Sequence, residues 1–394
     1  MMAKNIGVFV TGGIAAYKTP NIVRLLIKAG YDARVAMTAS AGHFVTAETL
    51  ATVSKHAVLT DASEFAAPEH VAHVALAHWM DVALVVPATA NTLAKMAFGL
   101  ADNVVTTTLL AFNGLTLVVP AMNDQMWANP QTQANVAHLR ARGVRVLEPA
   151  VGFLAEGYSA KGRMPAEAVV ALFVQTATSD QFLAGCKVVV TAGGTRERLD
   201  PVRYLTNDSS GKMGTALANV AAAAGAQVTL VTTAAQPVLP AVQQVAVASA
   251  AEMKAAVEAH FAAADIVIMA AAVADYRPAQ AADHKLKKTG EAGMTLPLVQ
   301  NPDILKALGA AKTHQFVAGF AAETDHVLAN AAAKLARKHV DLLIANQVGA
   351  GRGFNADDNE VVLLWPDRAP QPLARASKLT LASQILRQIQ EVRG

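Results

Sequence analysis

Short apolar runs alternate with amphipathic segments along the first half of the chain. Their valine-rich character is typical of parallel strands buried on both faces. Residues 19–30 (TPNIVRLLIKAG) predict a helix between the first two runs, with Thr19 as N-cap, Pro20 in the first turn and Gly30 at the end. This rhythm predicts βαβ units. The predicted strands are Asn5–Val10, Ala33–Thr38, Val82–Pro87, Thr116–Pro120 and Val144–Leu147.

A second series of the same kind begins after residues 176–185 (TATSDQFLAG), where the first pattern breaks. It includes a helix over Met213–Ala224 that Gly225 closes. We therefore predict an α/β protein of two domains, residues 1–181 and 182–394, each with a Rossmann-like parallel sheet. The second set of predicted strands is Lys187–Thr191, Gln227–Thr232, Gln244–Val247, Ile266–Met269, Phe316–Phe320 and Leu342–Asn346.

Composition narrows the function classes. Hydrophobic residues make up 53% and charged residues 16%, which indicates folded, core-rich domains. A net charge of +3 without a Lys/Arg block argues against nucleic acid as a partner. Cys186 is the single cysteine, so we expect no internal disulfide and a buried structural role for it. Because no signal peptide or membrane-spanning stretch is evident, we expect a cytoplasmic protein.

Polar residues follow four of the strands predicted in the first half. Residues 11–18 (TGGIAAYK) place glycines where backbone N–H groups approach an anion, and residues 37–40 (MTAS) add two hydroxyls. Residues 87–92 (PATANT) and 120–123 (PAMN) end two further strands. Because ligands bind at the carboxyl ends of parallel strands, these segments predict a cofactor crevice rather than four structural loops.

The TGGIAAYK, PATAN and PAMN segments resemble, in order and spacing, those of the flavin-binding cysteine decarboxylase family. The resemblance implies FMN bound between the subunits of a trimer. It also implies oxidation of the substrate's cysteine at the flavin, loss of CO₂ and return of the electrons. The residues that it assigns to FMN are Gly12, Gly13, Ile14, Ala15, Thr38, Ser40, Pro87, Ala88, Thr89, Ala90 and Asn91.

The same resemblance assigns two catalytic residues. His73 matches the family's catalytic histidine, and general-base work near neutral pH suits an imidazole. Its motif position selects it, because His70 and His78 lie close by and a histidine alone is weak evidence. Asn123 matches the asparagine that holds the substrate carboxylate.

One position departs from the family. Its flap reads Leu-Ala-Cys-Gly and then Gly-Arg-Met, and the cysteine protonates the enethiolate intermediate; here residues 154–157 read LAEG, followed by 162–164 (GRM). Glu156 therefore stands at the proton donor position. A solvated carboxyl group is ionised at neutral pH, whereas burial beside a flavin keeps it protonated. Glu156 is thus either the replacement acid or a solvated loop carboxylate in an impaired domain.

In the second half, residues 191–197 (TAGGTRE) lack the Gly-x-Gly-x-x-Gly spacing of a dinucleotide site. The long polar loop that follows leads into a helix and offers donors suited to a phosphate or carboxylate. Residues 270–277 (AAAVADYR) end another strand, and the lysines of 285–288 (KLKK) are either a solvated surface or a triphosphate clamp. Lys334 and Lys338, four residues apart on a predicted helix, face the same way.

The segments DPVRYLTNDSSGKMG, AAVADYRP, KLKK, NPDI and GFAAET resemble phosphopantothenate–cysteine ligase. Bacterial members use CTP and Mg²⁺ and form an acyl-cytidylate and pyrophosphate before cysteine attacks. The resemblance gives formation of the intermediate to Lys285 and its conversion to Asn207. Arg203, Asn207, Ser209 and Ser210 are the expected substrate-binding residues. The CTP site would comprise Ala270, Ala271, Asp275, Lys285, Pro302, Asp303, Ile304, Leu305, Phe320, Lys334 and Lys338.

Together the two halves resemble the bifunctional bacterial decarboxylase–ligase flavoproteins of coenzyme A biosynthesis. The resemblance implies that 4′-phosphopantothenate, cysteine and CTP are substrates, with FMN and Mg²⁺ as cofactors. We expect Mg²⁺ mainly on the phosphates, without assigned protein ligands. Trimeric flavin domains and dimeric ligase domains would make a homo-oligomer, up to a dodecamer. Three alternatives remain at this point: a ligase with a silent flavin domain, a regulatory FMN-binding protein, and an NAD(P) oxidoreductase, which lacks a convincing acidic ribose-binding signature.

Overall fold

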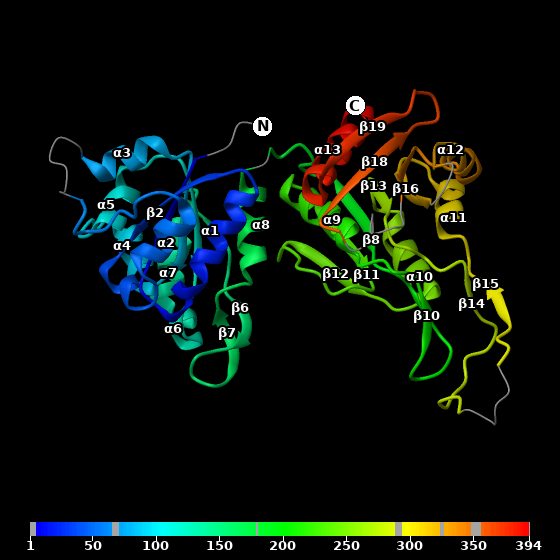
Figure 1. Ribbon diagram of the computed structural model, residues 1–394, viewed down its shortest axis with the longest axis horizontal. Coiled ribbons are helices and arrows are strands. Elements are labelled where there is room, and N and C mark those ends of the chain that lie inside the picture. The colour runs from blue at the N-terminus through cyan, green and yellow to red at the C-terminus, as the bar shows by residue number, and fades with distance from the viewer. Residues whose placement is uncertain are drawn as a thin grey trace. The chain divides into compact units, whose positions relative to one another are not determined.

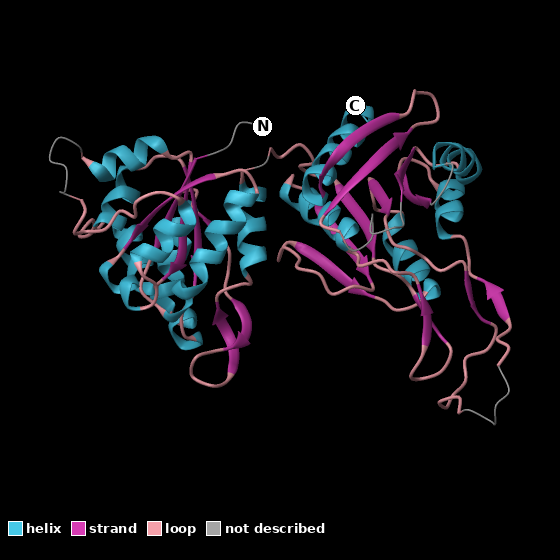
Figure 2. Ribbon diagram, in the orientation of Figure 1, coloured by secondary structure: helices cyan, strands magenta, loops and turns pink. Residues whose placement is uncertain are grey.

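The computed structural model describes residues 5–64, 71–178, 180–287, 294–323, 327–347 and 356–393. The chain divides into two compact units, Met1–Thr178 and Ser179–Gly394 (Figure 1). Each unit has a central sheet with helices packed around it (Figure 2). The predicted fold class, two α/β domains, is confirmed.

The sheet of the first unit is parallel throughout, in the order β2-β1-β3-β4-β5. The direction in which strands are added reverses between β1 and β3, and this reversal is the topological switch point where α/β sheets bind ligands. All five strands overlap the predicted runs. They are β1 (Asn5–Val10), β2 (Asp32–Met37), β3 (Val82–Ala88), β4 (Leu115–Pro120) and β5 (Arg145–Val146).

Helices cover both faces of this sheet, so alternate strand residues enter two different cores. Val8 packs in the core that contains Ile22 of the first helix, whereas Phe9 packs with Leu93 on the other face. The helices are α1 (Thr19–Lys28), α2 (Ala47–Ser54), α3 (Ala72–Trp79), α4 (Ala90–Phe98), α5 (Val104–Ala111), α6 (Asp124–Ala128), α7 (Pro130–Ala141) and α8 (Glu167–Ala177), with 3₁₀ helices Ile14–Lys18 and Ala39–His43.

The start of α1 differs from the prediction. Lys18, not Thr19, is the N-cap, and Thr19 is the first helical residue. Its fully buried hydroxyl instead donates a hydrogen bond to Val86 O at 3.2 Å. A tertiary contact with β3 has therefore replaced the expected local cap. Gly30 has a positive φ of 92° just beyond the end of the helix, as a C-terminal stop requires.

The second unit contains an eight-stranded sheet in the order β12-β11-β8-β13-β16-β17-β18-β19. From β12 to β17 the strands are parallel, and in chain order they have the Rossmann arrangement 3-2-1-4-5-6, with the switch point between β8 and β13. The strands are β8 (Lys187–Ala192), β11 (Gln227–Thr232), β12 (Val242–Ala246), β13 (Ile266–Met269), β16 (Phe316–Glu323), β17 (Leu342–Gln347), β18 (Asp358–Leu364) and β19 (Gln371–Ser377).

The antiparallel strands β18 and β19 were not predicted from the sequence, and neither were three two-stranded pairs. The pairs are β6–β7 (Ala150–Phe153, Ser159–Arg163), β9–β10 (Arg196–Arg198, Tyr204–Thr206) and β14–β15 (Tyr276–Pro278, Leu298–Gln300). The helices of this unit are α9 (Lys212–Ala223), α10 (Ala250–Phe261), α11 (Ile304–Ala311), α12 (Val327–Lys338) and α13 (Lys378–Arg393).

Within the described ranges, no helix is both long and apolar enough to cross a membrane.

Candidate functional sites

In the first unit, the loops after β1 and β3 are joined at the switch point. The Thr11 hydroxyl donates to Pro87 O at 2.6 Å and accepts from the Thr89 N–H at 3.1 Å. Thr11 is almost completely buried, so these two bonds fix the relative position of the loops. The TGGIAAYK and PATAN segments, predicted separately, therefore form one edge.

The loop after β2 closes against the same edge. A Cβ atom at Gly12 would lie only 2.5 Å from Ser40 Oγ, so the close approach of the two loops requires glycine. Thr38 Oγ1 lies 3.2 Å from Ser40 Oγ, which places both hydroxyls beside the glycine turn. Hydroxyls and glycine backbone are groups that cradle phosphates, so the residues present fit a phosphate-bearing flavin.

The PAMN segment and the β6–β7 hairpin extend this edge. The Ala121 N–H donates to Ala88 O at 3.2 Å, and the Met122 N–H donates to Gly162 O at 3.1 Å. A Cβ atom at Gly162 would lie 2.2 Å from Met122 O, so any other residue would push the hairpin away. The glycine of the flap motif thus docks the hairpin on the loop that carries Asn123.

A polar network joins the tip of the hairpin to the PAMN loop. The Asn123 side-chain N–H groups donate to Glu156 Oε1 at 2.9 Å and to the Tyr158 hydroxyl at 3.0 Å. Tyr158 donates in turn to Asp124 Oδ1 at 2.5 Å. This bond raises the pKa of Tyr158 and lowers the pKa of Asp124. The sequence had identified Asn123 and Glu156 but neither Tyr158 nor Asp124 as partners.

The burial expected around Glu156 is not present in the single chain. Glu156 is exposed at the turn of the hairpin, as are Ala155 and Gly157. Val151 and Phe153 on the same hairpin are 74% and 64% exposed, which is unusual for large apolar side chains. Any apolar surroundings for Glu156 must come from a ligand or a second copy of the chain.

The structure does not bring His73 to Asn123 within one chain. His73 lies in the first turn of α3, at the opposite end of the unit from the β6–β7 hairpin (Figure 1). Its Nδ1 makes a very short hydrogen bond with Glu64 Oε1. Among the residues that the structure describes, no hydrogen bond joins His73 to a residue predicted to bind FMN. His70 lies outside the described residues.

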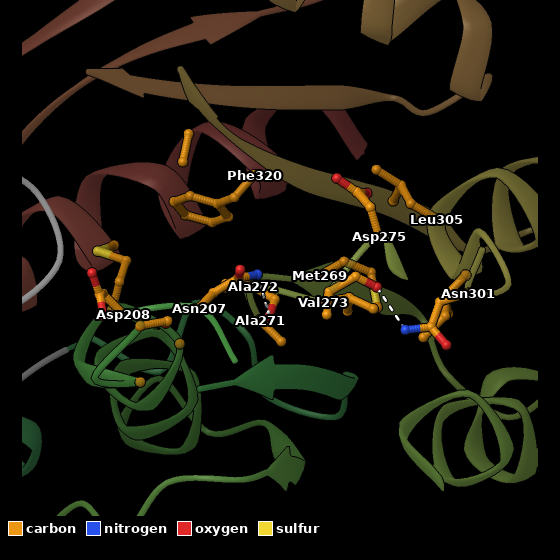
Figure 3. A pocket seen from close by; sticks show the side chains of 18 of the residues that line it. Asn207, Asp208, Met269, Ala271, Ala272, Val273, Asp275, Asn301, Leu305 and Phe320 are labelled. Carbon is orange, nitrogen blue, oxygen red and sulfur yellow. Dashed lines mark hydrogen bonds between the residues drawn. The ribbon is translucent and has the colours of Figure 1, made fainter. Parts of the chain in front are cut away.

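In the second unit, one pocket of about 850 Å³ opens at the carboxyl ends of the strands (Figure 3). It is formed by the loops after β10, β13 and β15 together with α9, α11, α12 and α13. Most of the predicted ligase residues meet here, although they come from widely separated segments. Those that line the pocket are Asn207, Ser209, Ser210, Ala270, Ala271, Asp275, Pro302, Asp303, Ile304, Leu305, Phe320, Lys334 and Lys338.

Hydroxyl and amide side chains hold the floor of the pocket. Thr191 Oγ1 accepts from the Ala271 N–H at 3.0 Å, tying the end of β8 to the end of β13. The Asn207 side chain donates to Ala272 O at 3.2 Å, a bond drawn in Figure 3. Asn207 therefore lies directly against the AAAVAD segment. The glycine turn after β8 packs beneath it, since a Cβ atom at Gly194 would lie 2.6 Å from Asn207 O.

Cationic side chains line the α12 side of the pocket. Lys334, Arg337 and Lys338 all line it. Lys338 is 9% exposed and forms a very short ion pair with Asp303, the N-cap of α11. Burial alone would raise the pKa of Asp303, but the hydrogen bond from Lys338 outweighs it and the pKa is lowered. Lys338 is thus held in place by a carboxylate.

Two further lysines line the pocket from α9 and α13. Lys212 pairs with Asp357 at 2.6 Å, and Lys378, only 6% exposed, donates to Ala356 O at 2.5 Å. Burial and the neighbouring Lys212 lower the pKa of Lys378. The sequence analysis missed both lysines as site residues. Lys212 belonged to a quoted motif, whereas nothing in the sequence near Lys378 indicated a role.

Two predicted ligase residues lie elsewhere. Arg203 is turned towards Asp200, with Arg203 Nη2 2.6 Å from Asp200 Oδ2, and it also donates to Leu286 O at 2.6 Å. Burial would raise the pKa of Asp200, but Arg203 and three backbone N–H groups hold it well below its usual range. Arg203 does not line the pocket within one chain and instead anchors the loop that carries Lys285, so its binding of substrate stays a prediction.

Lys285 itself is exposed and is not among the residues that line the pocket. Its neighbour Leu286 is fixed by the Asp200–Arg203 pair, with the Leu286 N–H 3.1 Å from Asp200 Oδ2. The expectation that Lys285 shares the pocket with Lys334 and Lys338 thus does not hold within one chain. Lys288 of the same motif lies outside the described residues.

The described residues contain no group of three or more His, Cys, Asp or Glu side chains arranged to hold a metal ion. The structure therefore assigns no protein ligands to Mg²⁺.

Comparison with known proteins agrees with this division. The family described as "Flavoprotein" matches residues 1–178, and the "DNA/pantothenate metabolism flavoprotein C-terminal domain" matches residues 183–392. The coenzyme A biosynthesis bifunctional protein CoaBC of Bacillus subtilis is 42% identical over 392 residues, covering 98% of this chain and 96% of that protein. The protein of the same name from Mycobacterium tuberculosis (strain H37Rv) is 44% identical over 400 residues, covering 97% and 95%.

Solved structures resemble the two units separately. The C-terminal domain of a CoaBC protein is 39% identical and covers 54% of this chain and 98% of that domain, with a TM-score of 0.47. A mutant PPC decarboxylase complexed with pantothenoylaminoethenethiol is 29% identical and covers 44% of this chain and 97% of that chain, with a TM-score of 0.42.

Fold and matched families together define a two-domain flavoprotein enzyme. More particularly, the chain belongs to the family of coenzyme A biosynthesis bifunctional proteins, which it matches over nearly its whole length. It is a decarboxylase and a ligase of coenzyme A biosynthesis. A purely regulatory flavoprotein is not favoured, because the relatives that match the full chain are bifunctional enzymes.

Proposed function

We propose that the second unit joins cysteine to 4′-phosphopantothenate at the expense of CTP, and that the first unit decarboxylates the product with FMN as cofactor. The observation that carries the ligase proposal is the pocket of about 850 Å³ in which residues from 206 to 378 converge. Its size and its cationic walls suit two anionic ligands side by side.

We assign the α11–α12 side of the pocket to CTP. Lys334, Arg337 and Lys338 would compensate the charge of the triphosphate, as cations do in other nucleotidyl transfers. Asp275 and Leu305 lie together on this side in Figure 3. Mg²⁺ would be coordinated mainly by the phosphate oxygens of CTP, as is usual in nucleotide sites.

We assign the α9–α13 side to the phosphate of 4′-phosphopantothenate. Ser209 and Ser210 precede the N-terminus of α9, and Lys212 and Lys378 flank it. Figure 3 shows Asn207 and Asp208 apart from Asp275 and Asn301, so the two sides are distinct. With its phosphate here, the pantothenate chain would direct its carboxylate towards the α-phosphate of CTP near the middle.

Two balanced steps follow from this arrangement. The substrate carboxylate attacks the α-phosphorus of CTP, forming the acyl-cytidylate and releasing pyrophosphate. The cysteine amine then attacks the acyl carbon, forming the amide and releasing CMP, and the amine gives up a proton to the solvent. Asn207, held against Ala272 O, presents an amide that would stabilise the oxygen on which charge develops in the second step.

Lys285 would complete the ligase site of a second copy of the chain. Its loop lies on an arm with β14 and β15, on which Tyr276 is 50% exposed and Leu298 46% exposed. Apolar side chains exposed on an arm are typical of a surface that meets another subunit. In a dimer of ligase units, each subunit would thereby place its Lys285 at the pocket of the other subunit.

In the first unit, the edge formed by Gly12, Ser40 and Thr89 would hold FMN. Bound FMN supplies the oxidation of the substrate's cysteine moiety that makes loss of CO₂ easy, and the later return of the electrons. Asn123 would hold the substrate carboxylate, and His73 would accept a proton from the substrate. Because the two residues lie at opposite ends of one unit, His73 would come from another copy, as a trimer allows.

Glu156 would deliver the proton to the enethiolate carbon after CO₂ has left. Its carboxyl oxygen lies 2.9 Å from the Asn123 side-chain nitrogen, the group that would hold the substrate carboxylate. The acid would thus stand beside the carbon that loses CO₂. Cofactor, substrate and a neighbouring copy would supply the apolar surroundings that keep it protonated.

The direct test supplies purified protein with 4′-phosphopantothenate, cysteine, CTP and Mg²⁺ and identifies the products by mass spectrometry. We expect 4′-phosphopantetheine, CMP and pyrophosphate, together with FMN released on denaturation. Accumulation of phosphopantothenoylcysteine alone would mean a silent flavin domain. Product formation without CTP would refute the ligase mechanism.

A further inference from the structure

The partner of His73 was not indicated by the sequence analysis. Glu64 lies nine residues before it, and its Oε1 makes the very short hydrogen bond to His73 Nδ1. The His73 side chain is 24% exposed and the Glu64 side chain 8% exposed. A partly exposed imidazole is thus backed by a buried carboxylate.

Burial makes this carboxylate costly as a purely structural residue. Glu64 Oε2 is buried and has no hydrogen-bond partner among the residues that the structure describes. A buried carboxylate with only one of its oxygens engaged destabilises the fold, and a neutral side chain would serve packing better. The acid at this position is explained by what it does to His73.

Among the elements that contact α3, β2 brings one cation: the Arg34 guanidinium lies 4.2 Å from the ring centroid of Trp79, at the far end of α3 from His73. α5 (VVTTTLLA) and β1 (NIGVFV) contain no titratable side chain. Asp61, on the same loop as Glu64, is turned to the N-terminus of α5, where it accepts from the Val104 N–H at 2.7 Å. His78, further along α3, is exposed. Glu64 is therefore the one ionic partner of His73 among the described residues.

We propose that Glu64 is a positioning residue of the decarboxylase that holds the His73 Nδ1–H and leaves Nε2 as the proton acceptor. This inference rests on the proposed role of His73. When the substrate gives a proton to Nε2, the imidazole becomes an imidazolium cation, and the Glu64 carboxylate stabilises that charge. The carboxylate also fixes the tautomer and the ring orientation, as acid–histidine pairs do in other enzymes.

The test compares Glu64→Gln, Glu64→Asp and His73→Asn in the full-length protein, with phosphopantothenoylcysteine as supplied substrate. Gln keeps an oxygen that accepts from Nδ1–H but removes the charge. We expect kcat/KM to fall about 10- to 100-fold, and the acid limb of its pH profile to move to lower pH. Asp should recover part of the loss. Ligation by the second unit should be unchanged.

A second readout does not depend on turnover. The ¹⁵N spectrum of histidine-labelled protein, with the His73 signal assigned by its loss in His73→Asn, should show the Nδ1–H tautomer in the wild type and a mixture in Glu64→Gln. An unchanged pH profile and tautomer in Glu64→Gln, while His73→Asn is inactive, would overturn this inference alone. Full decarboxylation by His73→Asn would instead overturn the proposed role of His73.

Discussion

The two units differ in how many of their predicted site residues lie at the switch point of the sheet. In the second unit, strand ends and helix starts around the β8–β13 switch point gather nearly all the predicted ligase residues into one pocket. In the first unit, the loops at the β1–β3 switch point also meet, but His73 lies on α3 at the other end. One chain thus gathers most of the predicted ligase residues but separates His73 from the other predicted decarboxylase residues.

The difference shows which residues topology can place. A side chain that follows a parallel strand is carried to the common carboxyl edge by the sheet itself, as Ala271 after β13 and Asn123 after β4 are. His73 on a peripheral helix and Lys285 on a protruding arm have no such constraint. Such residues reach a site only through another copy or through movement, and the predictions below probe that distinction.

The largest effect is expected for His73→Asn. Loss of the general base should lower decarboxylation of supplied phosphopantothenoylcysteine by about 100- to 10,000-fold. Ligation should remain at the wild-type level because the second unit is untouched. The measurement is CO₂ release and CTP-dependent ligation on the same preparation, and a parallel loss of both activities would indicate misfolding instead.

Lys285→Ala and Asn207→Asp should each reduce ligation by more than about 100-fold, since each removes a group that acts on transition-state charge. Asn207→Asp should in addition accumulate the acyl-cytidylate. If Lys285 acts on the pocket of a second copy, co-expression of the two variants should restore part of the activity. Normal ligation by Lys285→Ala would make the lysines of 285–288 a solvated surface.

Glu156→Gln keeps size and polarity but removes the acid. We expect CO₂ release on the first turnover, then slow steady-state turnover and an unreduced enethiol product. Glu156→Cys should retain activity because it restores the family's donor. Tyr158→Phe is the matched control, since it removes the neighbouring hydroxyl of the same network. If Glu156→Gln turned over fully and Tyr158→Phe lost activity, Tyr158 rather than Glu156 would be the proton donor.

A smaller effect is expected at Lys378. Lys378→Ala should raise KM for 4′-phosphopantothenate about tenfold, the cost of losing one charge-assisted contact with a phosphate. Because burial lowers the pKa of Lys378, its charge is lost at a lower pH than that of an ordinary lysine. The wild-type KM should therefore rise in the alkaline range, and Lys378→Arg should remove this rise. If Lys378→Ala instead changed the KM for CTP, the α9–α13 side would be the CTP site, and the assignment of the two sides of the pocket would be reversed.

The regular parts of the fold could be predicted because each buried parallel strand is a short apolar run. β1, β11 and β13 have the expected bounds, and α9 ends at Ala223, one residue before the expected end. The irregular pairs could not be predicted, since β6–β7 and β14–β15 depend on contacts with other loops. β19 is mostly exposed, so its sequence lacks an apolar run.

Site residues divide in the same way. Asp275 follows β13 in a recognisable motif, so its placement was predictable. Asn207 was recognised by its motif alone, because it follows β10, an antiparallel strand that was not predicted. Lys378 begins the last helix and reaches the pocket only because α13 packs on α9. Glu64 and Tyr158 act through side-chain hydrogen bonds whose geometry no spacing rule encodes.

The central claim is that the decarboxylase site combines His73 of one copy with Asn123 of another. The most direct test co-expresses His73→Asn and Asn123→Ala chains in equal amounts and measures decarboxylation by the mixed oligomers, with each variant alone as control. Random mixing in a trimer should restore about a quarter of the wild-type activity, since each site needs one intact residue from each of two chains. Mixed oligomers that remain as inactive as the single variants would place both residues in one chain and contradict the account.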